Sequence, residues 1–94
     1  TIFVVLTTLI IPSVKAETLK VALWNITWLG SHKFNKRTPS DYSALARYAK
    51  ELDADVVALK EVESEEWARK VLGADYDYYF TTNSWVKRVG VAVK

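Results

Sequence analysis

The pattern of apolar and polar positions predicts four strands after residue 18. Alternation in the segment Leu-Lys-Val-Ala-Leu-Trp, residues 19–24, predicts a strand with at least one strongly buried face. The continuous apolar run Val-Val-Ala-Leu at residues 56–59 is typical of a strand that is buried on both sides. Residues 76–81 and 89–93 indicate two further strands, which could form a hairpin through residues 82–88.

Two helices are expected between these strands. The first has Thr38 as its cap, Pro39 at its first position and Asp41 as the partner in a capping box. Its buried face repeats at helical spacing and consists of Tyr42, Leu45, Ala46, Ala49 and Leu52. The second helix is expected over residues 64–72, with a serine cap, two glutamates in its first turn, and Gly73 as its stop.

The order of these elements predicts an α/β fold. Strand, helix and strand within about 40 residues form a βαβ unit, whose right-handed crossover makes the two strands parallel. The expected order is β-α-β-α-β-β, and its apolar faces need more sheet to cover them. The last strand reaches Lys94 without a turn, so we interpret residues 17–94 as an incomplete domain.

Residues 1–16 are interpreted as a signal peptide. Residues 2–11 are apolar except for two threonines, and Val14 and Ala16 would be the small residues before a cut at Glu17. The run is shorter than the roughly 20 residues that span a membrane, so no stable membrane insertion is expected after cleavage. The alternative is a buried N-terminal strand or helix. The signal peptide predicts a secreted or periplasmic protein, and the start on Thr1 suggests that the sequence begins inside a reading frame.

The composition limits the kinds of partner and catalytic site that the chain can have. Half of the residues are hydrophobic, at 50%, which is typical of a globular chain. Removing residues 1–16 takes Lys15 from the 13 basic residues and leaves the 11 acidic ones, so the remainder is nearly neutral. That balance neither requires nor excludes a polyanionic partner. The chain has no cysteine, which excludes thiol catalysis and cysteine-bound zinc.

Asn25 and Glu61 are the candidate metal ligands. Asn25 follows the first strand and Glu61 closes the second, so parallel neighbours would bring both side chains to the same carboxyl edge. Mg²⁺ is held by one or two carboxylates together with water and phosphate oxygens, and an amide oxygen can also serve. Taken alone, a glutamate at the end of a strand is more often an ordinary solvated residue.

Two segments carry a resemblance to a known family. Leu-Lys-Val-Ala-Leu-Trp-Asn-Ile at residues 19–26 and Ala-Asp-Val-Val-Ala-Leu-Lys-Glu-Val at residues 54–62 resemble the opening of the endonuclease/exonuclease/phosphatase superfamily, the DNase I-like metal-dependent phosphoesterases. Residues 88–93 resemble a later strand of that family more weakly. The resemblance implies an α/β/β/α sandwich of four layers and metal-assisted hydrolysis of phosphate esters. Asn25 and Glu61 match the family's metal-site residues, and the cofactor would be Mg²⁺, or else Mn²⁺ or Ca²⁺.

The resemblance also defines what this chain would lack. The family's Asp-His pair and its further Asn and Asp residues come later in the domain, so no catalytic residue is assigned here. The full-length protein is expected to be the phosphoesterase, and this fragment is expected to be inactive. The substrate class stays open among nucleic acid, a phospholipid headgroup and a small phosphate ester. The rival interpretation is a secreted, non-catalytic binding module of the same fold.

Three other features of the sequence bear on the proposed site. Lys60 replaces the family's usual glutamine, and it would repel a metal if it pointed toward the site, although strand alternation would turn it away from Glu61. His32 is the single histidine and is expected in a solvated loop. The loop containing His32, Lys33, Phe34, Lys36 and Arg37 could touch a nucleic-acid backbone, or it could simply be solvated.

Overall fold

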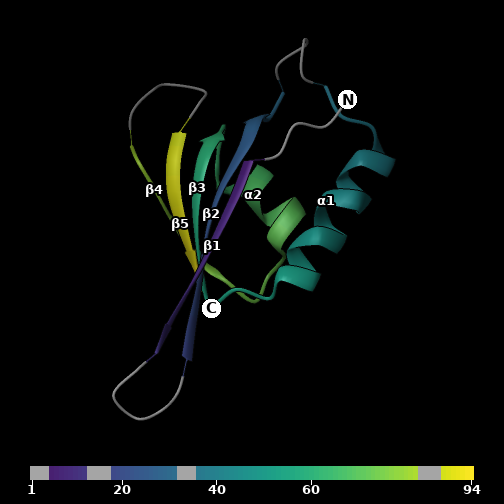
Figure 1. Cartoon of the computed structure of the whole chain (residues 1–94). Helices are drawn as coiled ribbons and strands as arrows, with labels where there is room; N and C mark the ends of the chain where they lie inside the picture. Colours follow the sequence, from purple (N-terminus) through teal and green to yellow (C-terminus); the bar gives the residue numbers. More distant parts are fainter. Residues whose placement is uncertain (1–4, 13–17, 32–35, 83–87) are drawn as a thin grey trace.

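The computed structural model describes residues 5–12, 18–31, 36–82 and 88–94. In these residues a five-stranded sheet and two helices form a small mixed α/β domain (Figure 1). The strands are β1 (Val5–Pro12), β2 (Thr18–Leu29), β3 (Val56–Val62), β4 (Asp77–Phe80) and β5 (Arg88–Val93). The helices are α1 (Pro39–Leu52) and α2 (Glu65–Leu72). The strand order in the sheet is β1-β2-β3-β5-β4.

The central pair, β2 and β3, is parallel, as the sequence predicts. Val21 lies opposite Val56 in this pair, and α1 makes the crossover between the two strands. Two hydrogen bonds join the starts of the strands: Asp55 N donates to Lys20 O at 2.8 Å, and Lys20 N donates to the Asp55 carboxylate at 2.8 Å. Strand β5 runs antiparallel to both β3 and β4, which confirms the expected pairing of the last two strands.

The helices cover only one face of the sheet (Figure 1). That face carries the side chains that are fully or almost fully buried in the two central strands: Ala22, Trp24 and Ile26 of β2 with Val57 and Leu59 of β3. On the opposite face, Leu19 and Leu23 are 42% and 45% exposed. The expectation that β3 is buried on both sides was therefore wrong. Val56 and Ala58 are only partly buried, because no element of the described chain covers their face.

The predicted start of α1 is confirmed. Thr38 Oγ1 accepts a hydrogen bond from Asp41 N at 3.1 Å, and the Asp41 carboxylate accepts one from Thr38 N at 2.9 Å. This hydrogen bond from the backbone lowers the pKa of Asp41 below its usual value. The helix ends at Asp53, which adopts the left-handed conformation with φ 45°.

The second helix is where the sequence predicts it, although its start differs in detail. Helix α2 follows Ser64, but the serine side chain makes no capping hydrogen bond. Gly73 ends the helix with φ 88°, a conformation in which a side chain would be strained. The C-terminal end of α2 therefore depends on Gly73, and its start depends on the two acidic residues of the first turn.

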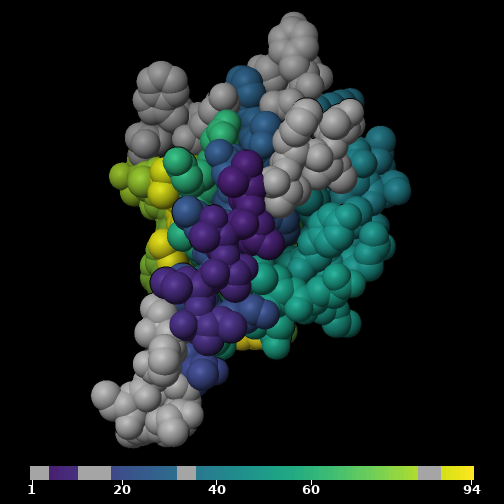
Figure 2. Space-filling model, in the orientation of Figure 1, coloured from purple at the N-terminus to yellow at the C-terminus, as the bar shows by residue number. Residues whose placement is uncertain are grey.

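The N-terminal segment contains a strand at the edge of the sheet. Strand β1 pairs antiparallel with β2, and Figure 2 shows it in purple on the surface of the molecule. Its side chains from Val5 to Ile10 are exposed, with Val5 at 65% and Ile10 at 60%. The structure thus contains an N-terminal strand, as in the alternative to a signal peptide, but its side chains from Val5 to Ile10 are exposed rather than buried. Cleavage before Glu17 stays a prediction.

Alkaline pH should destabilise the domain through Tyr78 of β4. Its hydroxyl donates to Gly73 O, and burial raises its pKa to about 12. Because the unfolded chain ionises near the ordinary value of 10.0, the stabilisation is complete below pH 10 and is lost as pH rises toward 12. The loss should be roughly 1–3 kcal/mol, since one pKa unit corresponds to about 1.36 kcal/mol and solvent screens part of the effect.

Urea unfolding between pH 9 and pH 12 measures this effect. Tyr78→Phe should reduce the fall in unfolding free energy with pH, leaving the smaller contributions of Tyr42 and Tyr76, whose pKa values are also raised by burial. The matched control is Tyr79→Phe, because Tyr79 is the next residue and is 63% exposed. An unchanged slope in Tyr78→Phe would contradict the assignment.

Candidate functional site

Strands β2 and β3 are both irregular near their carboxyl ends. Asn25 is paired with Lys60, and the next pair along the two strands is Leu29 with Val62. Three residues of β2 thus lie opposite one residue of β3. Thr27, Trp28 and Glu61 fill this interval with φ values of 38°, 56° and 59°. Non-glycine residues adopt this left-handed region at a cost, and such residues cluster at functional sites.

Asn25 and Glu61 come to the same edge of the sheet, as expected from parallel strands. The register places Asn25 beside Lys60, which immediately precedes Glu61. Both predicted ligands are partly buried. Asn25 Oδ1 accepts a hydrogen bond from Thr27 N at 3.0 Å, which orients the amide and uses one of the two lone pairs of that oxygen. Their role as metal ligands stays a prediction.

The irregularity also decides which residues of β3 face the core. Leu59 is fully buried, and Val62, rather than Glu61, provides the next fully buried side chain. Lys60 is exposed and is the register partner of Asn25, so the two side chains share the face opposite the helices. The cation at position 60 therefore lies on the same face as the predicted amide ligand. Within the described chain, no three or more His, Cys, Asp and Glu side chains are arranged so that they could hold a metal ion.

Arg37 holds the irregular end of β2 in place. Its guanidinium donates to the backbone oxygens of Ile26 at 2.7 Å, Thr27 at 3.0 Å and Trp28 at 3.3 Å. These carbonyl groups belong to the segment that departs from regular pairing, so the guanidinium replaces partners that a neighbouring strand would otherwise supply. By its sequence, Arg37 belongs to a loop that could touch nucleic acid. The structure gives its side chain a structural task, and residues 32–35 of that loop lie outside the described chain.

Glu63 makes a second connection at this edge. Its carboxylate accepts hydrogen bonds from the backbone nitrogen and the hydroxyl of Ser31, the latter at 2.9 and 3.0 Å. Glu63 N donates to Leu29 O at 2.8 Å. These contacts require glycine at position 30, because a Cβ there would overlap the Glu63 side chain. The charge of Glu63 is thus used to tie the end of β2 to the start of α2.

A pocket of about 440 Å³ opens beside this connection, on the helix side of the sheet. Its lining combines small, aromatic and basic residues: Gly30, Ser31, Lys36, Tyr42, Trp67 and Lys70. The Tyr42 and Trp67 rings are stacked, with centroids 6.1 Å apart and an angle of 28°. Lys70 Nζ lies 4.1 Å from the centroid of the Trp67 ring. Sequence reasoning missed this pocket, since its residues come from three separate segments.

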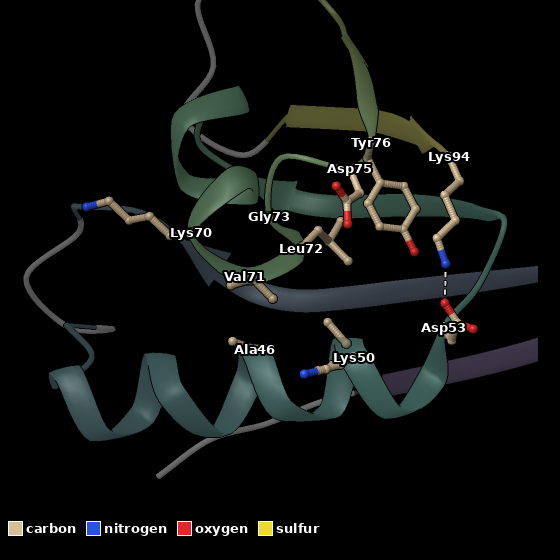
Figure 3. A pocket seen from close by; sticks show the side chains of 11 residues that line it. Ala46, Lys50, Asp53, Lys70, Val71, Leu72, Gly73, Asp75, Tyr76 and Lys94 are labelled. Carbon is tan, nitrogen blue, oxygen red and sulfur yellow. Dashed lines mark hydrogen bonds and ion pairs between the residues drawn. The ribbon is translucent and has the colours of Figure 1, made fainter.

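A second pocket, of about 330 Å³, lies between the C-terminal ends of the two helices (Figure 3). Lys94 forms an ion pair with Asp53 at its rim, and Lys94 Nζ lies 5.8 Å from the Tyr76 ring centroid. Lys70 extends away from this ion pair in Figure 3. Carboxylates and ammonium groups are mixed in this lining, so the pocket selects no single charge.

Neither helix of the described chain is long and apolar enough to cross a membrane. Comparison with protein-family models, with curated proteins and with solved structures finds no match to this chain. The case for a function therefore depends on the geometry of the carboxyl edge and on the resemblance of residues 19–26 and 54–62 to one superfamily.

Proposed function

We propose that this chain is the N-terminal part of a metal-dependent phosphoesterase domain of the endonuclease/exonuclease/phosphatase superfamily. In this proposal Asn25 and Glu61 supply ligands to Mg²⁺, or to Mn²⁺ or Ca²⁺, in the full-length protein. The observation that carries the proposal is the shared irregularity of β2 and β3. Beside it, at the edge where the parallel strands end, lie a partly buried amide and a partly buried carboxylate, with Glu61 in a left-handed backbone conformation.

The two side chains suit a hard divalent cation. Glu61 supplies a carboxylate, and Asn25 Oδ1 keeps one lone pair beyond its bond to Thr27 N. Mg²⁺ usually takes one or two carboxylates and completes its octahedron with water and phosphate oxygens. When bound, the metal would neutralise charge on the phosphoryl oxygens and on the leaving group during attack by water. The residues of this chain would position that centre by holding the amide and the carboxylate at a fixed edge.

The uncovered face of the sheet supports the four-layered sandwich. Leu23 of β2, Tyr79 of β4 and Val89 of β5 are 45%, 63% and 51% exposed on the face opposite the helices. Sheets bury an apolar face against another layer, so a second sheet packed there is the expected completion of the domain. The α and β layers described here would then be one half of the α/β/β/α arrangement.

The alternative is a secreted binding module that keeps this fold without catalysis, and Lys60 favours it. An exposed ammonium group on the same face as Asn25 would weaken cation binding by Coulomb repulsion. The two proposals predict different responses to Lys60→Gln. In a phosphoesterase this substitution should raise the affinity for Mg²⁺ and lower the concentration needed for half-maximal rate. If the protein is a binding module, neither the wild type nor Lys60→Gln should show metal-dependent hydrolysis.

Glu61→Gln in the full-length protein tests the metal assignment. Loss of the carboxylate charge should raise the Mg²⁺ concentration for half-maximal phosphodiesterase activity by at least about tenfold, comparable to losses seen when groups that support a metal site are removed. The assay is hydrolysis of a chromogenic phosphodiester during a magnesium titration. Glu66→Gln is the matched control, because Glu66 is exposed in the first turn of α2. Equal magnesium dependence in wild type and Glu61→Gln would reject the ligand role.

A further inference from the structure

The pocket beside Gly30 and Ser31 has the composition of an anion site. Lys36, Arg37 and Lys70 line it, and among the residues that the structure describes no carboxylate does. The nearby Glu63 carboxylate already accepts hydrogen bonds from Ser31. Lys36 and Lys70 are exposed and form no ion pair with any residue of the described chain. The pocket therefore has an excess of positive charge that an oxyanion would neutralise.

The aromatic residues give the same pocket an apolar wall. Tyr42 and Trp67 are partly buried and stacked, so their positions are fixed by packing between α1 and α2. Lys70 Nζ lies 4.1 Å from the Trp67 ring centroid and 5.9 Å from that of Tyr42. The two rings thus hold the ammonium group of Lys70 at the pocket by cation–π attraction. The pocket therefore presents a positive charge and an aromatic surface side by side.

We propose that this pocket binds a small phosphate monoester. The phosphate group interacts with Lys36 and Lys70, and the organic part packs against Tyr42 and Trp67. The volume of about 440 Å³ lies in the range of pockets for small ligands, roughly 300–1,000 Å³, and suits a compact molecule. Neither Asn25 nor Glu61 lines the pocket, so binding here is separate from the proposed metal centre.

Arg37 has a supporting part in this site. Two of its nitrogens hold the carbonyl groups at the end of β2, while its Nε is buried without a hydrogen-bond partner in the described chain. The guanidinium therefore adds a fixed positive charge to the pocket wall. The direct contacts with the phosphate group come from Lys36 and Lys70, whose side chains are exposed.

Isothermal titration calorimetry of the 94-residue chain, in EDTA and low salt, tests the proposal without any divalent metal. The probes are phenyl phosphate, glycerol 3-phosphate and inorganic phosphate. Phenyl phosphate should bind with one-site saturation and at least about tenfold more tightly than glycerol 3-phosphate, since only its ring can pack against the aromatic wall. Equal affinity for phenyl phosphate and glycerol 3-phosphate would overturn the assignment of that wall.

Two lysine variants locate the binding. Lys70→Gln should weaken phenyl phosphate binding about tenfold, because a hydrogen bond to a charged group is lost. Lys50→Gln is the matched control: Lys50 is also exposed on a helix and lines the second pocket but not this one, whereas Lys70 lines both. Equal weakening in both variants, or no saturable binding to the wild type, would overturn the site. Because the assay contains no metal, its failure leaves the Glu61→Gln test of the metal centre unaffected.

Discussion

Leu59→Ala should lower the free energy of unfolding by about 2–5 kcal/mol, the range for removing a fully buried leucine side chain. Leu59 has no exposed surface and lies in the central strand, opposite Trp24 of β2 and Gly90 of β5. The Phe80 ring occupies the space above Gly90, where an added Cβ would overlap it. Packing on this side is therefore already close, and the neighbours can only partly fill the space that the leucine leaves.

Leu23→Ala is the matched control for this substitution. Leu23 stands in the neighbouring strand one residue before Trp24, but it points to the uncovered face and is 45% exposed. Its truncation should change the unfolding free energy by well under about 1.5 kcal/mol, because about half of its surface already contacts water. Urea denaturation monitored by far-ultraviolet circular dichroism compares the two. Similar losses in both variants would contradict the assignment of the core to the helix side.

Arg37→Ala should destabilise the domain by about 3 kcal/mol or more. The substitution leaves the carbonyl groups of Ile26, Thr27 and Trp28 without their charged donor, and hydrogen bonds to charged groups contribute about 1.5–3 kcal/mol each. The effect should be local as well as global. Amide hydrogen exchange should increase most between residues 26 and 29, where the backbone conformation depends on the guanidinium.

Arg37→Lys should recover only part of this loss. An ammonium group cannot bond three carbonyl oxygens in the planar arrangement that the guanidinium provides. Lys36→Ala is the control, since Lys36 precedes Arg37 and is exposed. Full stability in Arg37→Lys would show that positive charge alone, without the planar geometry, holds the end of β2.

The features predicted correctly are those that depend on local patterns. The capping box of Thr38 and Asp41, the apolar face of α1 and the stop at Gly73 each arise within a few residues. The parallel pairing of β2 and β3 follows from the handedness of a strand–helix–strand unit. Asn25 and Glu61 could be assigned to one sheet edge for the same reason, because strand order and direction decide where strands end.

The irregular end of β2 could not be predicted in this way. Thr27, Trp28 and Glu61 have positive φ although none is glycine, so the usual sequence signal for that conformation is missing. Strand β2 consequently extends to Leu29, five residues beyond the expected end at Trp24. The role of Arg37 depends on carbonyl groups 9 to 11 residues earlier in the chain, and no periodic pattern encodes such a contact.

The hydrogen bonds between Lys20 and Asp55 have a consequence for the kinetics of folding. These residues are 35 positions apart, and the backbone contacts of β2 with β3 can form only after the intervening chain has closed into a loop. Loop closure has an entropic cost that rises with loop length, so contacts across β2 and β3 should form late unless α1 has already shortened the path. Early formation of α1 through its capping box would therefore set the rate at which the central strands meet.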